Sequence, residues 1–235
     1  MNQKNDPIGQ AILDFVQKGK TDDIIVSSDL CEDDVIETAY LFRTLKEMPV
    51  IEKLALKHCV GLVLDIGAGA GAHAKVLKSQ GINVNALEPS AGAAEYIRSQ
   101  NIPVIQDTIQ QVKDVKFDTL LLMMNGLGLA GKLENLASFL THLKGLLNPG
   151  GKIICDSTDI QYLYQEDDGS MWMDLNAEYY GNFKFQMKYK DHQTDWFDWL
   201  YVDFNRLCDV ADEVGLSVEL LHEEDDHYLV ELKIK

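Results

Sequence analysis

Residues 63–71 read Val-Leu-Asp-Ile-Gly-Ala-Gly-Ala-Gly, and this stretch decides the fold. Its first four residues are mostly apolar, as in a short buried strand, and they run directly into glycines at alternate positions. Gly67 and Gly69 would let the backbone turn sharply and approach a ligand without a Cβ atom in the way. The N-terminus of a helix after such a turn favours polar or negative groups of the ligand. The stretch therefore predicts a strand, a ligand-binding turn and a helix.

An alternation of short apolar runs and helical segments extends over residues 61–156. Such an alternation predicts βαβ units and a parallel sheet covered by helices on both faces. The predicted strands are Gly61–Ile66, Asn83–Glu88, Pro103–Gln106, Phe117–Met123 and Gly151–Asp156. Between them, helices should begin near His73, Ser90 and Leu133.

No repeat or linker interrupts the chain, so we predict a single domain over its 235 residues. We divide it into a helical cap (residues 1–57), a core (58–156), an insert (157–202) and a C-terminal unit (203–235). The helices expected in the cap are Ile8–Gln17, Asp33–Lys46 and Val50–Lys57. The second of these should end before Pro49, because the residue that precedes a proline avoids the α region.

Beyond the core, the pattern predicts strands with one further helix. Alternating apolar and polar residues in the insert predict a hairpin of Asn182–Tyr189 and Trp196–Val202 around the turn at residues 190–193. The C-terminal unit should contain a helix over Asp203–Val214 and two final strands, Leu216–Leu221 and His227–Lys235.

Composition excludes several classes of partner. The chain has 38 acidic and 21 basic residues, a formal net charge of -17, so its surface should repel the phosphate backbone of a nucleic acid. No apolar run approaches the roughly 18 residues of a membrane span, and residues 1–10 do not resemble a signal peptide, so we expect a cytoplasmic protein without a membrane partner. Four widely spaced cysteines, and His222 and His227 around an acidic turn, fit no ligand-spacing template, so we expect no metal.

Two carboxylates accompany the glycine-rich turn. Asp65 ends the predicted strand, where it can accept hydrogen bonds from the turn and favour a cationic ligand. Glu88 ends the next strand, about 20 residues further on, where a carboxylate can accept hydrogen bonds from ribose hydroxyls. Gly67, Gly69 and Ala72 also fit the dinucleotide fingerprint, so these residues predict an adenosine ligand without choosing between cofactors.

Four motifs in succession resemble those of class I S-adenosylmethionine-dependent methyltransferases. They are residues 63–71, Leu87-Glu88-Pro89-Ser90, Phe117-Asp118 with the following strand to Asn125, and Leu147-Asn148-Pro149-Gly150-Gly151. The resemblance implies methyl transfer from S-adenosyl-L-methionine. It also implies a Rossmann-like α/β fold, with a seven-stranded sheet that is mostly parallel, an antiparallel last strand and helices on both faces.

The resemblance assigns cofactor contacts to residues at the ends of the predicted strands, which are Asp65, Gly67, Gly69, Gly71, Glu88, Asp107 and Asn125. The glycines would border the methionine moiety, Glu88 would take the ribose hydroxyls, and Asp107 would face the adenine amino group. Asn125 would lie by the sulfonium amino acid. Two alternatives stay open, since Asp107 could cap the segment that begins at Thr108, and Asn125 could be a left-handed turn residue.

Segments outside the core supply the candidates for the methyl acceptor, which we expect to be a small molecule. Tyr40 and Arg43 lie three residues apart on the predicted helix Asp33–Lys46, where they could grip an acceptor carboxylate, close over the cofactor, or merely pack on the surface. His192, in the hairpin turn, is a candidate for a general base. Aromatic residues of the insert could form a pocket, a lid or the hairpin core; they are Tyr162, Tyr164, Trp172, Tyr179, Tyr180, Trp196 and Trp199.

Two other functions stay open. The shared glycine fingerprint and Glu88 would also suit an NAD(P)-dependent oxidoreductase, and the chain could be a cofactor-binding module without activity. Tyr180 and Lys184 have the spacing of the catalytic pair of short-chain dehydrogenases, but that pair works on a helix. Because the alternation around Lys184 predicts a strand, we interpret this spacing as a coincidence.

Overall fold

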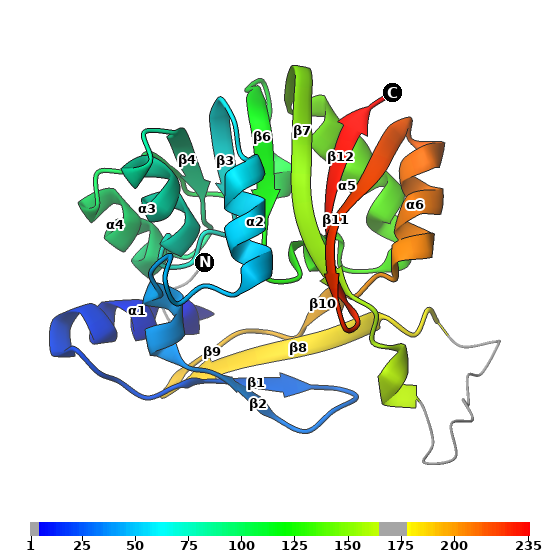
Figure 1. The fold of residues 1–235 in the computed structure, drawn as a ribbon. Coiled ribbons are helices and arrows are strands. Elements are labelled where there is room, and N and C mark those ends of the chain that lie inside the picture. The colour runs from blue at the N-terminus through cyan, green and yellow to red at the C-terminus, as the bar shows by residue number, and fades with distance from the viewer. Residues whose placement is uncertain (1–4, 165–177) are drawn as a thin grey trace.

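A computed structural model describes residues 5–164 and 178–235, which form two sheets (Figure 1). The main sheet has seven strands with helices on both of its faces. The second sheet lies across the end of the main sheet at which the parallel strands finish. The carboxyl ends of those strands therefore face another layer of the molecule.

The main sheet has the strand order β11-β12-β7-β6-β3-β4-β5. Its strands are β3 (Leu62–Ile66), β4 (Asn83–Leu87), β5 (Val104–Ile105), β6 (Phe117–Leu122), β7 (Leu147–Thr158), β11 (Leu216–Glu224) and β12 (His227–Ile234). β3 to β7 are parallel, whereas the last strand, β12, pairs antiparallel with both β7 and β11. This confirms the Rossmann-like fold class and the antiparallel last strand predicted from the sequence.

Helices cover both faces of the main sheet. They are α2 (Val50–His58), α3 (Ala72–Ser79), α4 (Ala91–Ser99), α5 (Leu133–Gly145) and α6 (Phe204–Glu213). Apolar residues of α2, α3 and α4 pack on one face, and those of α5 and α6 pack on the other. Ser90 caps α4 by accepting a hydrogen bond from the amide of Ala93, and Asp203 caps α6 in the same way from Arg206. The helices predicted from the core pattern are thus confirmed.

The second sheet joins the N-terminal segment to the insert. It has the order β10-β8-β1-β2, with β9 paired to β8. Its strands are β1 (Ile24–Ser28), β2 (Asp34–Ile36), β8 (Asn182–Tyr189), β9 (His192–Gln193) and β10 (Phe197–Leu200). The predicted hairpin is confirmed, because Phe197 to Leu200 pair with Phe185 to Asn182. Lys184 lies on β8, in agreement with the strand predicted there.

The predicted helix Asp33–Lys46 is wrong, so the cap over residues 1–57 is only partly helical. Its first residues form β2, and Thr38–Phe42 form the 3₁₀ helix η2. The physical reason is long-range pairing, since β1 binds β8 on one side and β2 on the other, and these backbone hydrogen bonds override the local helical pattern. The first predicted helix is confirmed as α1 (Pro7–Lys18).

The tip of the β8–β9 hairpin docks on α1. The Tyr189 hydroxyl donates a hydrogen bond to Asp14 Oδ2 over 2.9 Å, and the ammonium group of Lys190 also contacts that carboxylate. Asp14 lies on α1, and α1 in turn packs along α4 next to the main sheet. The hairpin tip therefore supports the N-terminal helix.

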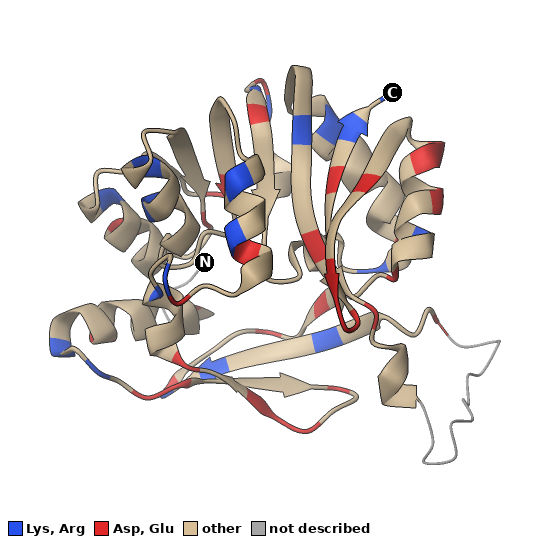
Figure 2. Ribbon diagram, viewed as in Figure 1, with Lys and Arg blue, Asp and Glu red and all other residues tan. Residues whose placement is uncertain are grey.

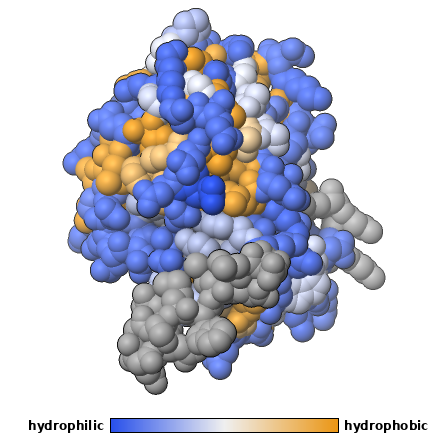
Figure 3. All heavy atoms as spheres, turned by 90° about the vertical axis from the view of Figure 1, so that its right-hand side faces the viewer, coloured by the Kyte–Doolittle hydropathy of each residue, from blue (hydrophilic) through white to orange (hydrophobic). Residues whose placement is uncertain are grey.

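Strand β11 forms one edge of the main sheet, and Figure 3 views the molecule from that side. Apolar side chains, shown in orange, gather in the upper part of this face. Leu220 on β11 is one of the exposed apolar residues of the molecule. Glu219, Glu223 and Glu224 place charges along the same strand, which discourages pairing with another edge. None of the helices in the described parts of the chain combines the length and apolar character that a bilayer crossing requires.

Candidate active site

The glycine-rich turn after β3 leaves open space beside its backbone. Gly67 and Gly69 have φ angles of +74° and +54°, which side chains rarely adopt, and a Cβ atom added to either would meet no atom within 4 Å. Gly71 also has a positive φ, but an added Cβ there would lie 3.3 Å from Ile97. Gly67 and Gly69 thus border space that a ligand can fill, whereas Gly71 lies against the protein.

Glu88 lies directly after β4 and ties this turn to the next helix. Its Oε2 accepts a hydrogen bond from the amide of Gly69 over 2.7 Å, and its Oε1 accepts one from Ser90 over 2.8 Å. The side chain is buried, and burial raises the pKa of Glu88 from 4.5 to about 7 even though both amides favour the charged form. A buried carboxyl group with a raised pKa therefore lies against the backbone of the turn.

Asp65 ends β3 and is almost completely buried. The amide of Ala74, in the first turn of α3, donates a hydrogen bond to Oδ2 over 3.0 Å, and His73 Nδ1 lies 4.0 Å from Oδ1. Burial raises the pKa of Asp65. The carboxyl group fixes the start of α3 against the end of the strand, whereas the sequence suggested hydrogen bonds from the glycine-rich turn itself.

A buried polar network joins η2, α2 and α3. Its centre is Glu52 on α2, whose carboxylate receives Arg43 Nε and Nη2, each over 2.9 Å, and lies 3.0 Å from His73 Nε2. Burial alone would raise the pKa of Glu52, but the hydrogen bonds from His73 and Arg43 outweigh it and lower the pKa to about 2. Sequence reasoning missed Glu52 and the role of His73, because no motif marks either residue.

Tyr40 and Arg43 are neighbours, as predicted, although the predicted helix is absent. Residues three apart lie above one another in a 3₁₀ helix, and the Arg43 guanidinium lies 4.2 Å from the centre of the Tyr40 ring. Arg43 is buried by its pairing with Glu52, whereas Tyr40 is partly exposed and reaches a cavity. The structure therefore leaves Tyr40 as the member of the pair that can meet a ligand.

The remaining predicted residues occupy different places. Asn125, after β6, has a left-handed φ of 58°, and its Oδ1 accepts a hydrogen bond from the Thr158 hydroxyl over 2.8 Å. Asp107, after β5, is exposed and accepts a hydrogen bond from the amide of Thr108 over 2.8 Å. His192 lies on β9, near α1, and is not among the described residues that line the cavity.

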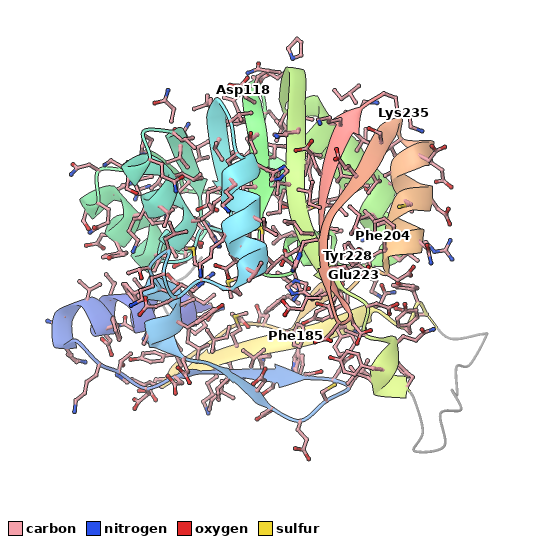
Figure 4. All side chains as sticks on the ribbon, in the orientation of Figure 1. Asp118, Phe185, Phe204, Glu223, Tyr228 and Lys235 are labelled. Atoms are coloured by element: carbon pink, nitrogen blue, oxygen red, sulfur yellow. The ribbon has the colours of Figure 1, made fainter. Side chains whose placement is uncertain are left out.

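This cavity, of about 610 Å³, lies where β6 and β7 end, beside the turn between β11 and β12. Its lining residues are Tyr40, Pro49, Ile51, Glu52, Met124, Asn125, Asp156, Thr158, Tyr162, Glu224, Asp225, Asp226 and His227. Figure 2 shows acidic residues in red at the lower end of β7 and along the β11–β12 turn. Figure 4 labels Glu223 at this end of the hairpin, above Phe185 on β8.

A histidine–aspartate pair lines the cavity. His227 Nε2 lies 2.8 Å from Asp156 Oδ2, and the amide of Gly126 donates to the other oxygen of Asp156 over 3.3 Å. Asp156 is buried, while the His227 side chain is 34% exposed. The sequence offered one signal for His227, its place beside an acidic turn, but Asp156 lies 71 residues away along the chain.

Most aromatic residues of the insert pack against protein. Tyr164, Tyr179 and Tyr180 form one cluster. The ring centre of Tyr180 lies 6.1 Å from that of Tyr164 and 4.6 Å from that of Tyr179. Trp199 covers Gly128, and Trp196 is largely exposed. Among the described aromatic residues of the insert, Tyr162 lines the cavity. Trp172 lies outside the described residues.

Comparisons with known proteins identify the family of this chain. A family model described as a methyltransferase domain matches residues 64–155. An S-adenosylmethionine-dependent methyltransferase from Bacteroides fragilis, crystallised with S-adenosyl-L-homocysteine, is 38% identical, and the match covers 100% of this chain and 97% of that one with a TM-score of 0.93. No protein in a search of curated sequences matches.

More distant structures share the fold. The CcbJ methyltransferase from Streptomyces caelestis is 14% identical with a TM-score of 0.59, over 81% of this chain and 94% of that one. The sugar N-methyltransferase KedS8 from a Streptoalloteichus species is 12% identical with a TM-score of 0.53, over 79% and 85%. At this identity both show the architecture alone.

The sheet order, the glycine-rich turn and the carboxylate after β4 are those expected of a Rossmann-like methyltransferase. With the 38% identical relative, they show that the chain belongs to the class I S-adenosylmethionine-dependent methyltransferases. The protein is therefore an enzyme whose cofactor is S-adenosylmethionine, and the oxidoreductase alternative is dropped.

Proposed function

We propose that this enzyme methylates a small-molecule acceptor bound in the cavity at the ends of β6 and β7. The observation that carries the proposal is the cavity itself, which has about 610 Å³ and includes Met124 and Asn125, the residues that follow β6. In the main sheet, β6 is the neighbour of β3, which leads into the glycine-rich turn. Cofactor and acceptor would thus meet across adjacent strand ends.

The cofactor would lie along the turn, in the space beside Gly67 and Gly69. Glu88 would receive the ribose hydroxyls, since its carboxyl group already accepts hydrogen bonds at this strand end. Asp107 would face the adenine amino group, and Asn125 the sulfonium amino acid. Asp65 and Gly71 would act beneath the ligand, by fixing the start of α3.

The reaction would be an in-line displacement. The bound cofactor supplies a methyl group already activated by its sulfonium. The protein then has to align the acceptor with that methyl and exclude water. Tyr40 and Tyr162 provide aromatic walls for the acceptor, and Glu52 holds η2 and α3 together behind it.

Charge favours a small molecule over a nucleic acid. The net charge is -17, and no lysine or arginine is among the described residues that line the cavity. Phosphate contacts, which dominate nucleic-acid affinity, need clustered basic residues.

A direct test measures S-adenosylhomocysteine formation with a library of small metabolites, in parallel with binding of tRNA and duplex DNA. We expect turnover with at least one small acceptor and no tight nucleic-acid binding. Tight, salt-dependent binding of either nucleic acid, or turnover restricted to it, would overturn the proposal.

A further inference from the structure

The pair of His227 and Asp156 has the geometry of a proton acceptor and its support. The Asp156 carboxylate lies 2.8 Å from Nε2 of the ring, and a carboxylate at this nitrogen favours the tautomer that carries its proton on Nε2. Nδ1 then keeps a lone pair with which to accept a proton. Asp156 is itself held by the amide of Gly126, so the pair is fixed to the end of β7 and the start of η4 (Gly126–Ala130).

The charge of the cavity indicates which acceptor would need that base. Five carboxylates line the space, on Glu52, Asp156, Glu224, Asp225 and Asp226. In the hydrogen-bond network described above, the guanidinium group of Arg43 is the cation next to these carboxylates. It is already paired with Glu52. Such a space repels anions and concentrates cations. The aromatic faces of Tyr40 and Tyr162 add to the attraction for a cation.

We propose that the acceptor is an amine, which enters the cavity as an ammonium ion, and that His227 is the catalytic base that removes its proton. Asp156 is the positioning residue for His227. This inference rests on the proposed function, because it names the substrate class and the base of that same site.

The chemistry balances without a further reactant. The ammonium group gives one proton to His227 Nδ1, which exposes the nitrogen lone pair. That lone pair forms the new bond to the methyl carbon, while the bond from carbon to sulfur breaks and its electrons stay on sulfur. The products are a methylated ammonium ion and S-adenosylhomocysteine, and His227 passes its proton to solvent.

The class of acceptor is tested with amines that are each matched to the alcohol and carboxylic acid of the same skeleton, such as benzylamine, benzyl alcohol and benzoate. We expect S-adenosylhomocysteine formation with amines, and neutralising the rim with Glu224→Gln, Asp225→Asn and Asp226→Asn should raise the amine KM about tenfold with little change in kcat. Turnover with alcohols or acids but not amines would overturn this inference and leave the proposed function standing. No turnover with any small molecule would overturn both.

The base is tested with His227→Gln, which keeps a polar side chain but cannot take the proton. We expect kcat for the amine to fall about 100-fold or more, with cofactor affinity within about twofold of wild type. His222→Gln, on the same hairpin but outside the cavity lining, is the matched control and should keep its kcat. Thermal melts of both variants show whether they fold. Unchanged kcat in folded His227→Gln would refute the assignment.

Asp156 is tested by a double-mutant cycle, which separates positioning from general stability. Asp156→Asn alone should lower kcat about tenfold, but in the His227→Gln background it should have no further effect, because its target is gone. Additive losses would show that Asp156 acts independently of His227. Imidazole added to His227→Ala should restore part of the activity, and no rescue in the folded variant would count against the base.

Discussion

The two sheets of this enzyme are stabilised by different kinds of contact. In the main sheet, the glycine-rich turn and its partner are local in sequence, since Gly67, Gly69 and Glu88, which accepts a hydrogen bond from the amide of Gly69, all lie within 22 residues. The second sheet depends on pairing between β1 and β8, which are more than 150 residues apart. The glycine-rich turn is thus specified by a short motif, whereas the second sheet depends on segments that are far apart in the chain.

The sheets meet through a few specific contacts. The amide of Val202 donates a hydrogen bond to the Ser157 hydroxyl over 3.0 Å, and the amide of Leu133 donates to Asn182 Oδ1 over 2.9 Å. Trp199 of β10 lies directly on Gly128 of η4. Substitutions at the turn should therefore affect cofactor binding, whereas substitutions at these junctions should affect stability first.

The largest effect is expected from Gly69→Val. A branched side chain would occupy the open space beside the turn and is strained at a φ of +54°, so cofactor binding should be lost. Gly81→Val is the matched control, because Gly81 has a φ of +81° and equally open space but lies away from the turn. Thermal-shift titration with S-adenosylmethionine checks both. A cofactor-induced rise in Tm of Gly69→Val would remove the turn from the cofactor site.

Glu88→Gln should weaken the cofactor but retain the fold. Loss of a charged acceptor for hydroxyl groups costs about 1.5–3 kcal/mol, or about 10- to 150-fold in affinity. Isothermal titration measures this change. Glu95→Gln, on the exposed side of α4, serves as control. Equal affinities of Glu88→Gln and wild type would show that Glu88 does not contact the cofactor.

The same variant should change how stability depends on pH. Since burial raises the pKa of Glu88 from 4.5 to about 7, the folded protein binds this proton more tightly than the unfolded chain. The resulting stabilisation is complete below pH 4.5 and is lost as pH rises to about 7, on the order of 3 kcal/mol. Wild type without cofactor should therefore lose stability relative to Glu88→Gln across this window. Parallel pH profiles of urea unfolding would contradict the burial of an ionisable carboxyl group.

Gly128→Ala should loosen the junction between the sheets. A Cβ atom there would lie 2.1 Å from Trp199 Cε2, so the indole must shift, at a cost of about 1–3 kcal/mol in the free energy of unfolding. Gly145→Ala, on α5, meets nothing within 4 Å and should be neutral or slightly stabilising. Urea unfolding compares the two, and equal stabilities would mean that the sheets are not braced at this contact.

The smallest effect is expected at the hairpin tip. Lys190→Met removes the ion pair with Asp14 but keeps the aliphatic stem, and exposed ion pairs contribute little to stability. Lys188→Met, at an exposed position of β8 two residues earlier, should leave stability unchanged. High salt should reduce the difference between Lys190→Met and wild type. A difference that salt leaves unaltered would mean that packing, not charge, holds the tip on α1.

The sequence by itself determined the main sheet and the turn. Short apolar runs between helical segments predicted β3 to β7, and Gly67 and Gly69 marked the turn after β3 where the backbone is left open. These features could be predicted because each depends on residues close together in the chain.

Only the tertiary structure decided the N-terminal segment and the polar side chains of the cavity. Residues 33–46 have a pattern that suits a helix, but β8 offers β1 a hydrogen-bonding edge, and β2 follows β1 into the sheet. His227 and Asp156 become partners because β12 runs antiparallel beside β7. Periodicity reports which face of an element is buried, but it does not report which distant strand lies alongside. Both outcomes depend on that pairing, which only the folded chain establishes.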